Sequence, residues 1–583
     1  MKWVKWVVNG SPHLIQNLEK DCRARFESIE IKGRDYYQDT ICSFMSIETC
    51  SYKYNIANMS NNDIIIFGDI ELFNMAVLCE KYEVNEVIFG QKSLIMLYEK
   101  CGKKIFDELN GEFSFVLFDK RKNEINLIVD PLGVKQLFWN YSNGILNAST
   151  DLFLLSEIID MEQWNKQYFK DFIELNGFYT GRETPRPNIF RVLPGHYVSI
   201  NLNSNEVVEK NYWNLSEIKT ITRYKTEEEY FEQFRKVLAQ ALERRLLPEK
   251  NGIAMSGGLD STTLFVVSKS MIAESDLKPV SGVFSRLHDC DESTLIKKVC
   301  DMYDTIPGLV NCDNSGMLVN YPEHFPFSDE PHCPSLSSSF AMKIMDYASK
   351  NSIVNLIDGY AADHLLAGTP LTSIDMIKRG KVLSIFRYIK DICYMFDESV
   401  FLSINKNLIK LENAEIDEVL LSNIKSSLGK VKTHSQKHIY AQIYYARTFK
   451  LLDRDIAPMF NLSMKHPFLD KDLIEFVYTI PGEMLLQKTM DKYIIREGMK
   501  NYLPSDVINK TQKTQHVSLS FGGVNKVWRD IFPIINQYRQ EDYYDSDISK
   551  EEWRSMLHDF RAGKTFTNRF LAMLCLELWL AEN

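Results

Sequence analysis

The spacing of hydrophobic residues divides the chain into two parts with different periods. Over about the first 200 residues, the apolar positions form short runs rich in β-branched and aromatic residues, which is typical of strands. A polar, turn-rich stretch at 201–209 follows them. We therefore place a domain boundary near residue 215, between a domain at 1–215 and a domain at 216–583. The strands expected in the first domain are at residues 3–8, 63–68, 113–118, 125–129, 136–139 and 196–200.

A helix is expected soon after this boundary. Thr226 and Glu229 have the spacing of a capping box, and apolar residues then recur at helical intervals from 230 to 242. Farther on, apolar strands alternate with helical stretches, which is typical of βαβ units on a parallel sheet. Ligands of such sheets bind where the strands end. The strands expected here are at residues 252–255, 280–285, 305–311 and 353–358, and from about 378 onward the chain is predicted to be largely helical.

Composition and charge exclude several classes of protein. Hydrophobic residues make up 45% of the chain and charged residues 25%, which indicates a globular fold. The net charge of -10 repels phosphate backbones, so we expect no nucleic-acid partner. The apolar run at 570–580 contains Glu577 and is shorter than the ~20 residues of a membrane span, which predicts a buried terminal helix and no membrane span. Eleven scattered cysteines and an N-terminus that lacks a signal peptide predict a cytoplasmic protein.

The clearest chemical signal follows the first strand of the second part. There the motif Ser-Gly-Gly-Leu-Asp-Ser, at 256–261, lies between a strand and a helical run. Its glycines let the backbone approach an anion, and the helix N-terminus adds free N–H groups. Asp260 would repel a phosphate unless a cation lay between them, which favours a bridging Mg²⁺. The alternative is a plain strand-to-helix turn with Asp260 as a cap; the motif is no Walker A loop, because it lacks the Gly-Lys-Ser/Thr ending.

The motif resembles the PP-loop of ATP pyrophosphatases, which cleave ATP between its α- and β-phosphates. In asparagine-synthetase-like members this loop binds pyrophosphate. The segment at 358–364 is similar to that family's Gly-x-x-x-Asp element, whose aspartate is the other magnesium ligand. The resemblance implies ATP and Mg²⁺ as cofactors, with Asp260 and Asp363 as metal ligands. It implies that ATP and pyrophosphate are bound by Met255, Ser256, Gly257, Gly258, Asp260, Ser261, Val283, Phe284, Ser285 and Gly359.

The resemblance covers most of the chain. Segments at 109–119, 130–138 and 193–195 are similar to the glutaminase-like domain of asparagine synthetases. The synthetase domain is matched by 467–470, by Lys492 with Arg496, and by 503–504 followed by Lys513. The implied fold is α/β with α+β: an N-terminal Ntn-type, glutaminase-like β-rich sandwich, and a C-terminal PP-loop domain of the adenine nucleotide alpha hydrolase type, with a parallel sheet and a helical C-terminal region.

The chain departs from the family's glutaminase at three points. The family uses an N-terminal cysteine as nucleophile, and this chain has Lys2 there. Residues 67–69 stand where the family has Asn-Gly-Glu, and Phe67 cannot donate a hydrogen bond to an oxyanion. Phe89-Gly90-Gln91 stands in place of the glutamine-binding Gly-Ser-Asp. We therefore expect the N-terminal domain to be a scaffold that does not hydrolyse glutamine.

Two further residues are expected to be catalytic. Asparagine synthetases carry a glutamate at the position of Tyr360, whereas β-lactam synthetases carry a tyrosine that helps deprotonate an amine of the same substrate molecule. Tyr360, with an unidentified carboxylate partner, is thus the candidate base; the alternative is a tyrosine packed in the core. Lys513 is expected to neutralise charge on the oxyanion and the phosphate. Its alternatives are the neighbouring Lys510, or a solvated surface role for Lys513.

Among relatives without a glutaminase, the chain is similar to lasso-peptide cyclases. The similarity lies in length and in the segments at 329–331, 359–365 and 576–580, although Ala361 and Ala362 depart from the usual small Gly/Ser pair. It implies a ligase that adenylates an Asp or Glu side chain of a precursor peptide and joins it to the peptide's N-terminal amine. Its partners would be that peptide, a leader-binding protein and a leader peptidase. The alternatives are a β-lactam synthetase-like or ammonia-dependent asparagine synthetase-like ligase, and a non-catalytic nucleotide-binding scaffold.

Overall fold

A computed structural model describes most of the chain. The residues described are 2–8, 20, 31–38, 41–48, 59–61, 63–84, 92–156, 163–177, 179, 181–319, 321, 329–380, 388, 418–447, 452–488, 490–511, 514, 517–543, 547–564 and 567–582. Within these ranges, no helix has both the length and the apolar character needed to cross a membrane.

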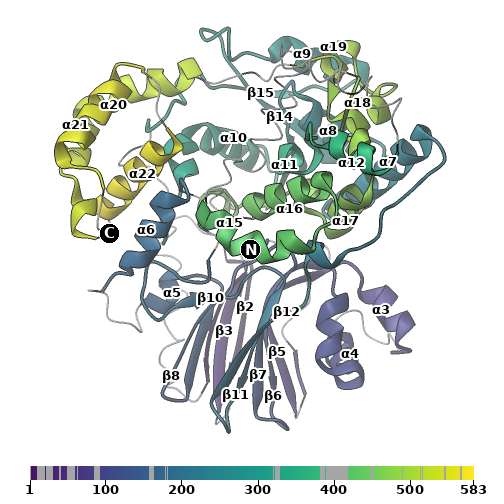
Figure 1. The fold of residues 1–583 in the computed structure, drawn as a ribbon, viewed down its shortest axis with the longest axis vertical. Coiled ribbons are helices and arrows are strands. Elements are labelled where there is room, and N and C mark those ends of the chain that lie inside the picture. Colours follow the sequence, from purple (N-terminus) through teal and green to yellow (C-terminus); the bar gives the residue numbers. More distant parts are fainter. Residues whose placement is uncertain are drawn as a thin grey trace.

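The first part of the chain forms two six-stranded antiparallel sheets (Figure 1). One sheet has the order β10 (Phe190–Arg191), β8 (Phe138–Ser142), β9 (Ile145–Ser149), β1 (Lys2–Val8), β3 (Cys42–Glu48) and β2 (Gly33–Gln38). The other has the order β12 (Glu206–Asn211), β11 (His196–Asn201), β7 (Glu124–Val129), β6 (Gly111–Asp119), β5 (Ile64–Leu72) and β4 (Met59–Ser60). The β-rich sandwich expected from the sequence is thus confirmed.

The two sheets pack face to face through alternate side chains of their strands. Trp6, Phe44 and Phe67 belong to the apolar core between them, and all three are buried. The outer face of the second sheet is covered by α3 (Met75–Lys81) and α4 (Ser93–Cys101), which lie beside it in Figure 1. Because strand side chains alternate between faces, the central strands β5, β6, β7 and β11 of this sheet each contribute to two cores.

The second part is built on a parallel sheet, as the alternating pattern predicts. Its order is β15 (Gly308–Asn311), β14 (Leu277–Val283), β13 (Asn251–Ala254), β16 (Asn355–Ile357) and β17 (Ser463–Lys465). One face packs against α7 (Glu227–Glu243) and α8 (Leu259–Lys269), and the other against α10 (Ser338–Lys350). The predicted capping box is present, with Thr226 and Glu229 each accepting from the other's backbone.

The C-terminal helices form a separate core that includes one helix from the first part. This core joins α20 (Val517–Ile535), α21 (Lys550–Arg561) and α22 (Asn568–Glu582) to α6 (Lys166–Glu174), as Figure 1 shows at the C-terminal end of the chain. The buried terminal helix expected at 570–580 is confirmed as part of α22. Glu577 is buried there and accepts hydrogen bonds from the backbone N–H groups of Arg539 and Gln540.

A buried ionic network joins the two parts. Lys465 Nζ, at the end of β17, lies 2.7 Å from Glu71 Oε1 and 3.1 Å from Glu112 Oε2. Arg245, after α7, contacts Glu112 at 2.8 Å and Asp470 at 2.8 Å. Burial alone would raise the pKa of Glu112, but Lys465 and Arg245 outweigh it and lower the pKa. The network therefore joins the sandwich to the domain of the parallel sheet through buried ion pairs, to which both parts of the chain contribute charged side chains.

Candidate active site

The loop between β13 and α8 is held by its own hydroxyl groups. Ser261 Oγ accepts from the backbone N–H of Ser256 at 3.0 Å, and the two serine oxygens are 3.1 Å apart. Gly257 N donates to Glu292 Oε2 at 3.0 Å, and a Cβ on Gly257 would lie only 2.9 Å from the Cβ of Glu292. Glycine at this position therefore permits the close packing of the loop against the segment that carries Glu292.

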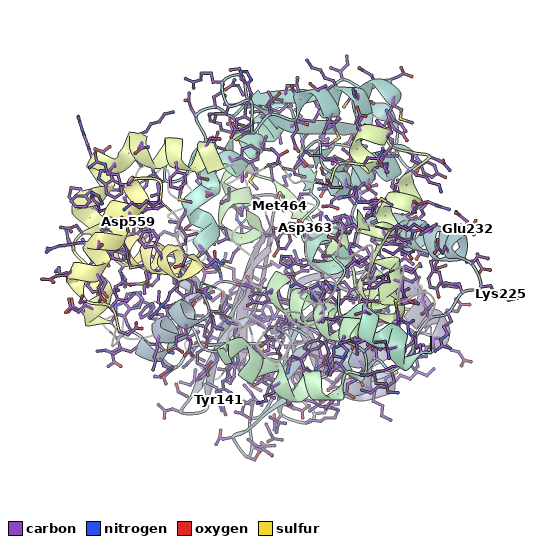
Figure 2. All side chains as sticks on the ribbon, turned by 45° about the horizontal axis from the view of Figure 1, so that its top comes forward. Tyr141, Lys225, Glu232, Asp363, Met464 and Asp559 are labelled. Atoms are coloured by element: carbon purple, nitrogen blue, oxygen red, sulfur yellow. The ribbon has the colours of Figure 1, made fainter. Side chains whose placement is uncertain are left out.

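Asp260 and Asp363 lie on either side of one ammonium group. Lys492 Nζ is 2.5 Å from Asp260 Oδ2 and 2.6 Å from Asp363 Oδ1. Asp260 comes from the first turn of α8, and Asp363 from α11 (Ala362–Leu366), which follows β16. Burial alone would lower the pKa of Lys492, but the two carboxylates outweigh it and raise the pKa. Figure 2 shows Asp363 toward the middle of the molecule, away from peripheral residues such as Asp559 and Lys225.

These residues line a cavity of about 460 Å³ at the carboxyl ends of the parallel strands. Three cations, Lys492, Arg496 and Lys510, face it. Such a concentration of cationic side chains beside a helix N-terminus is suited to a polyphosphate. The described lining residues are Ser256, Gly258, Leu259, Asp260, Glu292, Asp363, Asp491, Lys492, Arg496, Lys510, Thr511 and Thr514.

The donor set fits a magnesium ion. Both carboxylates converge on a single cation, the ammonium of Lys492, as two ligands of one divalent ion would. Among the described residues, no group of three or more His, Cys, Asp or Glu side chains could hold a metal. Magnesium is commonly bound by one or two carboxylates, with phosphates and water completing the coordination, and that is what a pair of carboxylates provides.

The strand-end residues expected near adenine lie beside this cavity without lining it. The backbone N–H of Met255 donates to Val280 O at 2.9 Å, which continues the pairing of β13 with β14 beyond the strand. Val283 ends β14, and Phe284 N and Ser285 N donate to Asp291 and Asp313. Gly359 packs against the loop, since a Cβ there would lie 3.3 Å from the backbone nitrogen of Ser261. The assignment of Met255, Val283, Phe284 and Ser285 to adenine, and of Gly359 to ATP or pyrophosphate binding, stays a prediction.

Tyr360 is partly buried and lies in a separate cluster around His466, which is itself buried. Its hydroxyl donates to the carbonyl oxygen of Ala446 at 2.7 Å, and its ring meets that of His466 edge to face, with centroids 5.3 Å apart. The imidazole of His466 lies between two carboxylates, 2.7 Å from Asp358 and 2.7 Å from Asp453. Burial, together with the charges of Asp453 and Asp358, raises the pKa of Tyr360 far above its ordinary value. The hydroxyl is therefore protonated at neutral pH.

His466 is positively charged throughout the physiological pH range, with a proton on both ring nitrogens. Burial alone would lower its pKa, but Asp358 and Asp453 outweigh it and raise the pKa to about 10. Asp358 Oδ1 also accepts the backbone N–H of Tyr360 at 3.0 Å. The clamped imidazolium thus fixes the backbone and the ring of Tyr360 at the end of β16.

Several expected residues fall outside the described part of the chain or take other roles. Lys513 and the segment 89–91 lie outside the described residues, and so does the side chain of Lys2. The alternative to Lys513, Lys510, contacts Glu292 and donates to Thr514 Oγ1 at 2.9 Å. Phe67 is buried, and its ring centroid lies 3.5 Å from that of Phe44.

Sequence reasoning missed four groups of the site. Glu292 precedes α9 (Ser293–Met302) in an unremarkable Asp-Glu-Ser segment that carries no signal. Lys492 and Arg496 were matched to the family, but without a role. His466 precedes the Pro-Phe-Leu-Asp motif at 467–470, and its two carboxylates come from distant segments. These carboxylates meet His466 only in the folded chain, so the sequence does not reveal the contact.

Comparisons with known proteins agree with this geometry. The asparagine synthase family profile matches residues 233–581, and a glutamine amidotransferase domain profile matches 56–213. The amidase chyE of Penicillium rubens is 22% identical, over 75% of this chain and 73% of its own length. Asparagine synthetase [glutamine-hydrolyzing] 2 of Bacillus subtilis is 23% identical, over 76% and 61%. Asparagine synthetase [glutamine-hydrolyzing] 1 of the same organism is 22% identical, over 89% and 85%.

The extent of the first match decides the assignment. The asparagine synthase profile spans more than half of the chain and includes the loop at 256–261, Asp363 and Lys492. The protein therefore belongs to the asparagine synthase family and is an ATP-dependent, AMP-forming carbon–nitrogen ligase.

Proposed function

We propose that the protein is a lasso-peptide cyclase. In this reaction an Asp or Glu side chain of a precursor peptide is adenylated and then joined to the peptide's own N-terminal amine. The observation that carries the proposal is the pairing of Asp260 and Asp363 around one cation at a phosphate-binding loop, combined with a tyrosine at position 360. The first feature suits adenylation of a carboxylate, and the second favours an amine supplied by the substrate itself.

In the first step, an oxygen of the peptide carboxylate attacks the α-phosphorus of ATP. A new O–P bond forms, the bond between the α-phosphorus and the bridging oxygen breaks, and pyrophosphate leaves. Ser256, the backbone at Gly258 and the N-terminus of α8 would hold the departing pyrophosphate, with Lys492, Arg496 and Lys510 facing it. Asp260 and Asp363 would hold Mg²⁺, which neutralises phosphate charge when it is bound.

In the second step, the amine nitrogen attacks the carbonyl carbon of the acyl-adenylate. The C–N bond forms, the bond between the carbonyl carbon and the phosphate oxygen breaks, and AMP leaves. The raised pKa of Tyr360 argues against a free phenolate as the base. We assign its hydroxyl oxygen the task of accepting a hydrogen bond from the incoming amine. The amine proton then passes to the phosphate of AMP or to water.

The N-terminal domain supports a substrate-borne amine. At position 67, where the family has an oxyanion-hole asparagine, this chain has a buried phenylalanine packed on Phe44. Well-placed intramolecular groups reach effective molarities of ~10⁵ M or more, so a pre-folded peptide can outcompete water for the adenylate. A leader-binding protein and a leader peptidase would present such a peptide with its amine free.

Mass spectrometry tests this function. The protein is incubated with ATP, Mg²⁺ and a leaderless precursor peptide that has a free N-terminus and an acidic residue. We expect the loss of one water from the peptide together with AMP, in the native protein and in Glu228→Gln, which alters an exposed carboxylate, and no product in Asp260→Asn. Asparagine formed from aspartate and ammonium would favour an asparagine synthetase-like ligase, a cyclised small amino acid a β-lactam synthetase-like ligase, and no AMP with any substrate a scaffold. Each of these outcomes would contradict the proposal.

A further inference from the structure

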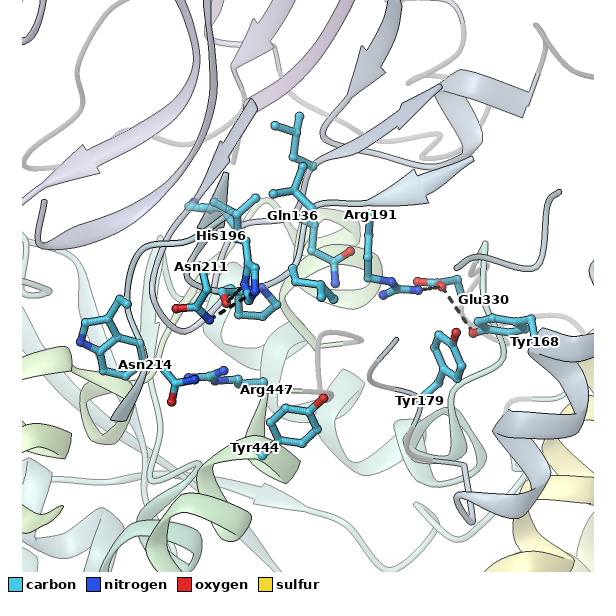
Figure 3. Close-up of a pocket in the computed structure, with 18 of the residues that line it drawn as sticks. Gln136, Tyr168, Tyr179, Arg191, His196, Asn211, Asn214, Glu330, Tyr444 and Arg447 are labelled. Carbon is cyan, nitrogen blue, oxygen red and sulfur yellow. Dashed lines mark hydrogen bonds and ion pairs between the residues drawn. The ribbon is translucent and has the colours of Figure 1, made fainter. Parts of the chain in front are cut away.

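A second cavity lies between the two parts of the chain. It has a volume of about 240 Å³ and shares no lining residue with the cavity at the phosphate-binding loop. The first part contributes Gln136, His196 and Asn214 to its wall, and the second part contributes Tyr444 and Arg447 (Figure 3). Domain interfaces are common sites for small ligands, although this cavity is below the usual range of ~300–1,000 Å³.

Arg447 lines this cavity, and its guanidinium group has unused hydrogen-bonding capacity. It follows α16 (His434–Ala446), and its guanidinium faces Trp213, with 5.5 Å between the guanidinium carbon and the ring centroid. Its Nε is buried and has no hydrogen-bond partner among the described residues. No described carboxylate forms an ion pair with it, and burial lowers its pKa, although the charge of Asp130 partly opposes this shift. A guanidinium nitrogen that is buried without a hydrogen-bond partner is costly, so a ligand anion that pairs with it would be stabilising.

The other cations of the wall already have carboxylate partners. Arg191 pairs with Glu330, and Lys135 Nζ lies 3.0 Å from Asp69 Oδ2. His196 accompanies Arg447 as a neutral group, because burial lowers its pKa. Among the described residues of the wall, Arg447 is therefore the cation without a directly paired carboxylate. A guanidinium fork matches a carboxylate in two parallel hydrogen bonds, and one carboxylate balances one positive charge.

The rest of the wall suits the remainder of such a molecule. Trp213 and Tyr444 contribute aromatic surface to the wall, and Asn214 contributes an amide whose oxygen accepts a hydrogen bond from the backbone N–H of Ser216 at 2.9 Å. Figure 3 shows Arg447 and Tyr444 on one side of the cavity and His196 and Asn211 on the other. We propose that this interdomain cavity binds a small carboxylate-bearing molecule, held by Arg447 and separate from the ATP site.

Thermal unfolding of the full chain without ATP tests this site, since a ligand that binds only the folded state raises the Tm. The probes are sodium acetate and sodium succinate, compared with chloride and inorganic phosphate at equal ionic strength. We expect either carboxylate to raise the Tm of the native protein more than chloride does. The shift should be absent in Arg447→Gln and retained in Arg529→Gln, which alters an exposed arginine of α20. Without a probe, Arg447→Gln should be at least as stable as the native protein, because it removes a guanidinium whose Nε is buried and has no partner among the described residues.

A second variant keeps the proposal testable if Arg447→Gln does not fold. Ser427→Phe fills the cavity but keeps Arg447, and it should abolish the carboxylate shift in the same way. Succinate titrated by calorimetry should bind at least tenfold more weakly to both variants than to the native protein or Arg529→Gln. Equal carboxylate shifts in all four proteins, a shift with phosphate alone, or no shift in the native protein would overturn the proposal. None of these results depends on ligase activity, so the ATP site and this site are tested separately.

Discussion

The ammonium of Lys492 lies 2.5 Å from the carboxylate of Asp260, in the position that a divalent cation would share with Asp363. Lys492 is almost completely buried, whereas Asp363 is half exposed, with 46% of its side chain accessible. The lysine is therefore the counter-ion of the carboxylate pair in this structure. If Asp260 and Asp363 bind magnesium as proposed, we expect the lysine to leave this position and to neutralise phosphate instead.

We expect Lys492→Gln to bind Mn²⁺ more tightly than the native protein when ATP is absent, because the competing ammonium is gone. An affinity gain of about tenfold, equivalent to ~1.4 kcal/mol, is the expected size. Electron paramagnetic resonance of Mn²⁺ measures it directly. Lys500→Gln, which alters an exposed lysine paired with Glu497, serves as the control and should leave the affinity unchanged. An unchanged affinity in Lys492→Gln would show that the lysine does not occupy the metal position.

The stability of the protein should depend on the protonation of His466. Its pKa in the folded state is about 10, against about 6.5 for an unperturbed histidine. The ion pairs with Asp358 and Asp453 therefore stabilise the fold fully below about pH 6.5, and this contribution is lost as the pH rises through about 10. In His466→Gln, the Tm should fall less between neutral and alkaline pH than it does in the native protein.

Thermal unfolding between pH 6 and pH 10.5 measures this difference. His558→Gln is the matched control, because the side chain of His558 is 81% exposed. That variant should follow the native curve. Parallel curves for the native protein and His466→Gln would contradict the raised pKa.

The buried network between the two parts of the chain should be sensitive to the loss of one charge. Glu112→Gln leaves Lys465 and Arg245 with one carboxylate fewer, and breaking a buried pair in this way costs about 3–5 kcal/mol. Urea unfolding should show the loss. Glu217→Gln breaks an exposed pair with Lys430 and should cost no more than ~1 kcal/mol. Equal losses in the two variants would mean that the network does not hold the parts together.

Glutamine should not serve as a nitrogen source. The aromatic ring of Phe67 offers no donor to a tetrahedral oxyanion, so we expect no glutamate above the rate of the reaction without protein. A coupled glutamate assay, run with and without ATP and peptide, measures this. Glutamate release that depends on the protein would place a working glutaminase in the N-terminal domain.

The parts of this structure that the sequence predicts are those with local causes. The capping box of Thr226 and Glu229 and the strand–loop–helix at 252–270 depend on neighbouring residues, and both are found as expected. Strand β12 was missed because all its residues are exposed, so its polar sequence resembles a loop. Strand β3 was missed as a short, serine-containing run that is buried only by its pairing with β1 and β2.

The site shows the same limit. Asp260 and Asp363 carry local motif signals, and the structure brings them to one cation. The third member, Lys492, is 232 residues away from Asp260, and its ammonium reaches the pair only through the packing of α18 (Tyr493–Met499) on α7. Likewise, the clamp of His466 by Asp358 and Asp453 joins three separate segments. Such contacts depend on tertiary structure, which no local pattern records.

The central claim is that a peptide carboxylate is adenylated before the amine attacks it, and an isotope label tests this most directly. Both carboxylate oxygens of the acidic side chain in the leaderless peptide are labelled with ¹⁸O. The AMP formed during cyclisation is then analysed by mass spectrometry. Because the carbonyl carbon loses one of its oxygens to the phosphate, AMP should carry one ¹⁸O atom. AMP without label, or ADP as the nucleotide product, would contradict the mechanism.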